Sequence, residues 1–151
     1  MRIYPPVHVI NPEKFDLGTA QTPGSERLAA VAPQFGIETT MWGGLFEVAA
    51  GRRTGIHHHG EQQTIAYVLS GICQVQWGEQ CEYAAMAKAG DFIHVPAFLP
   101  HMEINLSNSE PFRWVVVRST SQPSWSIFQT IHGRLGDIPA PRQCQSRWRL
   151  T

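Results

Sequence analysis

Three histidines have the spacing of a metal site. His57 and His59 are separated by one residue, and His101 follows later in the chain. Side chains one residue apart on a β-strand point to the same face of the sheet, so the first two imidazoles would project together. His101 on a second strand would complete a set of three nitrogens and leave coordination positions open for water, dioxygen or a substrate oxygen. The sequence therefore predicts a catalytic metal site with His57, His59 and His101 as ligands.

Short β-rich runs surround these histidines between residues 39 and 120. The runs are rich in β-branched and aromatic residues, show frequent alternation, and are separated by glycine or proline turns at spacings of about ten residues. Trp77-Gly78-Glu79-Gln80 is typical of a tight hairpin between two of them. The pattern indicates an all-β sandwich or barrel, and we expect an antiparallel meander that closes on itself.

The flanking segments differ from this central region. Prolines recur through residues 1–35, which predicts an extended N-terminal arm laid over the barrel. Residues 121–151 are expected to form a C-terminal appendage. Because 151 residues suit one domain, we expect a single barrel over 36–120 between these two segments.

Composition excludes some partners. Lys plus Arg and Asp plus Glu both number 12, so there is no basic excess for nucleic acid or an anionic membrane surface. Charged residues make up 16% of the chain, against roughly 25% in an average soluble domain, which favours a homodimer. The sequence shows no transmembrane run and no leader-like start, so a cytoplasmic location is expected.

Two motifs resemble those of the cupin superfamily. The first is G-x5-H-x-H-x(3,4)-E-x6-G, matched at Gly51, His57, His59 and Gly71; the second is G-x5-P-x-G-x2-H-x3-N, matched at Gly90, Pro96, His101 and Asn105. Over most of residues 1–125 the chain is similar to uncharacterised RmlC-like cupins. The resemblance implies an all-β double-stranded β-helix, or jelly-roll, barrel with a metal ion inside.

The chain departs from the first motif at its glutamate. Counting from Gly71 places Thr64 there, and counting from His59 places Gln63 there. The register anchored at Gly71 points Thr64 inward, whereas a local bulge would reverse this. Threonine is a poor ligand, so we expect a three-histidine site with the amide oxygen of Gln63 as a possible fourth ligand.

The second motif also holds a departure. Phe98 stands at the motif's glycine, and we expect it to need only an ordinary backbone conformation.

Two further residues near the histidines have different expected roles. Glu103 lies two residues beyond His101 and would face the same cavity, as a general base, as a hydrogen-bond partner of a ligand imidazole, or as a ligand; an exposed position at the strand end is the alternative. His58 alternates with the ligands and is expected to point away from the metal.

The leading functional hypothesis is a metal-dependent enzyme that acts on a small molecule. Resemblance to three-histidine cupin dioxygenases favours a non-haem Fe(II) dioxygenase, although the same ligands suit Mn(II), Ni(II), Zn(II) or Cu(II). One alternative is a non-redox lyase, isomerase or cyclase that uses Glu103 as base. The other is a small-molecule-binding module without turnover.

Overall fold

The computed structural model describes residues 3–17 and 24–120. Two short 3-10 helices, η1 (Pro12–Lys14) and η2 (Pro33–Phe35), accompany the strands, and the described residues contain no α-helix. No helix in these ranges has the length and apolar character needed to cross a membrane. The strands are β1 (Ser25–Val31), β2 (Trp42–Val48), β3 (Thr64–Ser70), β4 (Ile72–Trp77), β5 (Tyr83–Lys88), β6 (Phe92–Val95), β7 (His101–Asn105) and β8 (Phe112–Arg118).

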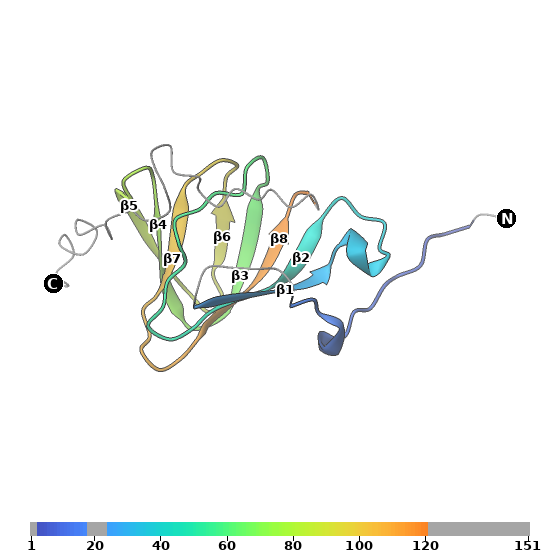
Figure 1. Cartoon of the computed structure of the whole chain (residues 1–151), viewed down its shortest axis with the longest axis horizontal. Helices are drawn as coiled ribbons and strands as arrows, with labels where there is room; N and C mark the ends of the chain where they lie inside the picture. The colour runs from blue at the N-terminus through green and yellow to red at the C-terminus, as the bar shows by residue number, and fades with distance from the viewer. Residues whose placement is uncertain (1–2, 18–23, 121–151) are drawn as a thin grey trace.

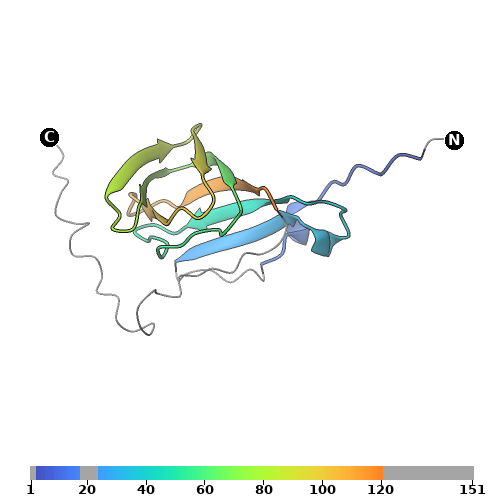
Figure 2. The same cartoon turned by 90° about the horizontal axis from the view of Figure 1, so that it is seen from above.

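The strands form two antiparallel sheets. One sheet has the order β1-β2-β8-β3-β6, the other has the order β5-β4-β7, and Figures 1 and 2 show the two sheets enclosing one interior. The expectation of an all-β jelly roll is confirmed. The expected meander is wrong, because the chain passes from one sheet to the other after β3, and β8 inserts between β2 and β3.

Alternation along the strands separates the interior from the outer surface. In β2, buried and partly exposed residues alternate from Trp42 to Val48. In β3, buried and exposed residues alternate from Thr64. Buried side chains from the two sheets meet in one hydrophobic core that includes Val68, Cys73 and Phe112. The predicted hairpin is present, since β4 and β5 pair antiparallel with Trp77 opposite Tyr83.

The N-terminal segment contributes a strand to the larger sheet. Within the range expected to be an arm, β1 pairs with β2 from Ser25 to Val31, with a shift of register between Ala29 and Val31. Residues 3–9 are exposed, and the segment before η1 extends away from the barrel in Figure 1. The C-terminal appendage expected over 121–151 lies outside the described residues.

Candidate functional site

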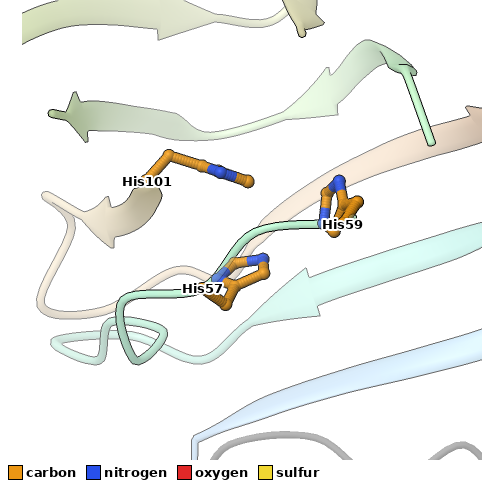
Figure 3. A group of neighbouring side chains, drawn as sticks. All are labelled: His57, His59 and His101. Atoms are coloured by element: carbon orange, nitrogen blue, oxygen red, sulfur yellow. The ribbon is translucent and has the colours of Figure 1, made fainter. Parts of the chain in front are cut away.

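Two neighbouring segments bring the three predicted ligands together. His57 and His59 lie on an extended segment before β3, and His101 begins β7 (Figure 3). Backbone hydrogen bonds of 2.9 Å run in both directions between His57 and His101. One potential ligand atom from each of the three histidines lies within 4.8 Å of the others. The clustering predicted from sequence is therefore present, although the first two histidines are on a bridging segment instead of a regular strand.

Hydrogen bonds orient all three imidazoles. His57 Nδ1 donates to Gly55 O at 3.0 Å, and His101 Nδ1 donates to Leu99 O at 2.8 Å. A carbonyl oxygen only accepts, so each of these Nδ1 atoms carries a proton, and Nε2 is the ring nitrogen left to face a metal ion. His59 Nε2 accepts from Arg118 Nη2 at 3.3 Å, so its Nδ1 donates to Thr64 Oγ1 at 2.7 Å. Such partners of Nδ1 are typical of histidines that bind a metal through Nε2.

The donor set suits a divalent transition metal. His101 is 1% exposed, and its Nε2 is buried with no hydrogen-bond partner among the described residues. A buried polar atom without a partner is costly, and a metal ion is one way to satisfy an imidazole nitrogen. Three neutral nitrogens fit Fe(II), Mn(II), Ni(II), Cu(II) or Zn(II) and do not choose among them.

Thr64, and not Gln63, faces the histidines. Thr64 is buried in the cavity wall, whereas Gln63 is exposed and its Oε1 lies 3.2 Å from His94 Nε2. The expectation of Gln63 as a fourth ligand is therefore wrong. The physical reason is strand alternation: the register anchored at Gly71 holds without a bulge at this end of β3, which sends residues 63 and 65 outward.

Glu103 occupies the interior next to His101. Its side chain is 12% exposed, and Oε1 lies 3.6 Å from His101 Nε2. Thr54 Oγ1 donates to Glu103 Oε2 at 2.8 Å and accepts from the Glu103 backbone N–H at 2.9 Å. The alternative of an exposed strand-end glutamate is excluded, and the carboxylate is held in one orientation beside the imidazoles.

Two arginines reach the same region, and the sequence reasoning missed both. The guanidinium carbons of Arg27 and Arg118 lie 5.2 and 5.3 Å from the centroid of the Trp42 ring. A Cβ on Gly44 would lie 2.7 Å from Trp42 Cη2, so the glycine leaves room for the indole. Arginine over an indole face is a favourable cation–π arrangement, which holds both guanidinium groups next to Trp42.

Burial shapes the charge states at the site. It lowers the pKa of His57 and of His59, for which Arg118 acts in the same direction, so both imidazoles stay neutral at neutral pH. Burial alone would raise the pKa of Glu103, but His101, His57, the Thr54 hydrogen bond and Arg118 together lower it, and the group is a carboxylate. Burial and the charge of Arg27 lower the pKa of Arg118 to about 9, which leaves the guanidinium cationic.

Some of these groups line a small cavity of about 20 Å³, enough for roughly one water molecule. The polar lining consists of His57, His59, Thr64, Glu103 and Arg118, and the remaining wall is apolar and aromatic. The lining residues are Phe46, His57, His59, Thr64, Ala66, Ile93, Val95, Glu103, Trp114, Val116 and Arg118.

Two other residues can be compared with their expectations. His58 lies outside the cavity lining, and its Nδ1 accepts a hydrogen bond from Gly60 N, as expected for a residue that points away. Phe98 has φ of 58°, which corrects the expectation of an ordinary conformation. The left-handed region is disfavoured for a side chain with a Cβ, and the 2.7 Å bond from Phe98 N to Gly60 O fixes the turn.

A sequence signal for Arg118 existed. Trp114, Val116 and Arg118 alternate on β8, so an inward tryptophan implies an inward arginine. Thr54 gave no such signal, because its contact with Glu103 joins segments far apart in the chain.

Comparisons with known proteins identify the fold. Residues 44–118 match the family described as Cupin domain. The polyketide cyclase RemF from Streptomyces resistomycificus has a TM-score of 0.64 at 19% identity, covering 78% of this chain and 82% of its own. An uncharacterised double-stranded β-helix protein from Klebsiella pneumoniae has a TM-score of 0.60 at 17% identity, covering 78% and 94%.

A third similar structure is the oxalate decarboxylase from Bacillus subtilis. It has a TM-score of 0.58 at 21% identity over 67% of this chain and only 27% of the decarboxylase. No curated protein gives a significant match. At these identities the similar structures show a shared fold.

Proposed function

Because the chain carries a cupin domain over residues 44–118, we propose that it is a metal-dependent enzyme acting on a small molecule at the three-histidine site. One observation carries the proposal. His57 and His101 turn Nδ1 to a carbonyl and His59 turns Nδ1 to Thr64, so the Nε2 atoms are the nitrogens left to bind a metal ion. Three protein ligands are typical of catalytic sites that keep positions open for substrate.

The first candidate reaction is dioxygenation with non-haem iron. Bound Fe(II) would supply redox chemistry with dioxygen, whereas a non-redox metal would polarise a substrate oxygen. The chain's part is to orient three neutral ligands and to exclude bulk water with the aromatic wall of Phe46 and Trp114, whose rings stack at 4.7 Å. Low polarity of that wall strengthens every electrostatic interaction inside the cavity.

The second candidate is a lyase, isomerase or cyclase reaction, and Glu103 favours it. Its carboxylate is buried, ionised and oriented by Thr54, with Oε1 facing the histidines. A carboxylate held in this way can take a proton from a substrate in the cavity. The fold shared with a polyketide cyclase and an oxalate decarboxylase supports this candidate by analogy alone.

Metal analysis with oxygen uptake tests the proposal. Protein purified without a histidine tag is analysed for metals, and oxygen consumption is followed with small acids, diketones and thiols. Near-stoichiometric iron with substrate-dependent uptake supports the dioxygenase. Zinc, nickel or manganese without uptake supports the non-redox reaction, and a protein that binds no metal would contradict both and leave a binding module.

The Glu103→Gln variant separates the roles of that residue. If Glu103 is a base, the variant keeps its metal and loses turnover by about 100-fold or more, the usual range for general-base catalysis. If Glu103 is a ligand, metal affinity falls instead. The measurements are metal titration and turnover on the same preparation, and unchanged values for both would exclude Glu103 from the chemistry.

A further inference from the structure

Arg118 and a metal ion require the same atom of His59. The imidazole Nε2 has one lone pair, which accepts from Arg118 Nη2 at 3.3 Å. A metal ion bound to that nitrogen takes the lone pair, so the guanidinium must find another acceptor. Arg118 Nε is also buried and makes no hydrogen bond among the described residues.

The charges near the cavity favour the binding of an anion. Among the described residues, Glu103 is the only carboxylate that lines the cavity, and its Oε2 already accepts a hydrogen bond from Thr54 Oγ1. Arg118 and Arg27 add two positive charges next to Trp42, and a divalent metal would add two more. Positive charge in excess inside a barrel is unfavourable unless an anion accompanies it.

We propose that the site binds a small carboxylate whose charge is held by the guanidinium of Arg118 beside the three histidines. The inference rests on the metal-dependent function proposed above and adds the substrate class to it. Arg118 lines the cavity, and its planar donors match the two oxygens of a carboxylate. The cavity of about 20 Å³ holds roughly one water molecule, so even a small carboxylate requires the wall to move when it binds.

Linked binding of Zn(II) and acetate tests this assignment. Zn(II) is titrated calorimetrically into the metal-free, full-length protein, with and without saturating acetate, and acetamide serves as the neutral isostere. If bound Zn(II) raises the affinity for acetate, bound acetate must raise the affinity for Zn(II) by the same factor. We expect acetate to tighten Zn(II) binding about tenfold. Acetamide should leave the affinity unchanged.

The Arg118→Met variant gives the decisive contrast. Without acetate it should bind Zn(II) at least as tightly as the wild-type protein, because the competing donor and its charge are gone; with acetate it should show no tightening. Arg118→Lys, which keeps the charge but loses the planar fork, should show a smaller acetate effect than the wild type. Arg113→Met is the matched control, since Arg113 lies exposed on the same strand and pairs with Glu47, and it should behave as wild type.

Two results would overturn the proposal. Equal acetate effects in the wild-type protein and Arg118→Met would show that Arg118 does not hold the anion, and weaker Zn(II) binding in Arg118→Met would show that it supports the ligands instead of competing for His59.

If the wild-type protein binds no Zn(II), the proposed function fails separately. Acetate titrated into metal-free protein, followed by tryptophan fluorescence, then decides the anion site: loss of binding in Arg118→Met supports it, and no binding in the wild type refutes it.

Discussion

The two ends of the barrel interior are built from the same strands but have opposite chemistry. At one end, which we term the core end, Val48, Val68 and Phe112 are fully buried and apolar. At the other, the site end, β3 and β8 present Thr64 and Arg118. Strand alternation decides which side chains point inward at both ends, whereas position along the strand decides whether the inward group is apolar or polar. The site therefore lies on strands whose inward side chains change from apolar to polar along their length, and the apolar part stabilises these strands.

Asn105, at the core end of β7, has a structural role. Its Nδ2 donates to the backbone carbonyls of Val48, Ala49 and Glu110 at 2.8 to 3.2 Å. Two residues before it on the same strand, Glu103 faces the cavity. One strand thus carries a loop anchor and a site carboxylate, and variants at the two ends should have separable effects.

The largest effect is expected at the core end. Phe112→Ala removes a fully buried ring and should lower the free energy of unfolding by about 3 to 5 kcal/mol, through lost burial and a new cavity. Chemical denaturation measures this, and Zn(II) titration below the midpoint should show an unchanged affinity. A large loss of metal affinity would mean that the two ends are coupled.

His101→Ala should show the reverse pattern. Loss of one of three ligands should weaken Zn(II) binding by about 100-fold or more, while the metal-free protein loses less stability than Phe112→Ala. Calorimetric titration of His57→Ala, His59→Ala and His101→Ala checks the assignment, with His58→Ala as control. Retention of metal by all four variants would contradict the site.

Acid should destabilise the site end selectively. Burial lowers the pKa of His57 and His59 below the ordinary 6.5, so the unfolded chain binds protons that the folded metal-free protein does not. Stability should therefore fall as pH decreases below about 6.5, by up to about 1.4 kcal/mol per pH unit for each imidazole. Denaturation of the metal-free protein between pH 7.5 and 5 measures the slope, which should decrease in His59→Asn and remain in His58→Ala.

The smallest effect concerns backbone strain near the site end. Phe98→Gly places the residue that favours φ of 58° at this turn and should raise the free energy of unfolding by about 1 kcal/mol. Thermal unfolding measures the change, and metal affinity should stay the same. A loss of stability would show that the contact of the ring with His58, at 6.2 Å between centroids, outweighs the strain.

Much of the difference between the core end and the site end follows from patterns in the sequence. Alternation predicts the strands and the inward position of Glu103, because both depend on residues close together in the chain. The histidine cluster joins distant segments, and it is predicted from the spacing of the two motifs that resemble those of cupins. Gln63 illustrates the limit: one residue of register separates a ligand from an exposed side chain, and two ways of counting gave different answers. The pairing of Thr54 with Glu103 and the place of β1 in the sheet depend on contacts between distant segments, which periodicity does not specify.

The two hydrogen bonds between the backbones of His57 and His101 have a dynamic consequence. They join the two ligand-bearing segments through backbone groups alone, so metal binding need order little additional chain. Amide hydrogen exchange at these two residues should be slow already in the apoprotein and slow only modestly further on metal addition. The loss of backbone conformational entropy on metal binding would then be small, because the fold already holds the ligand segments in place.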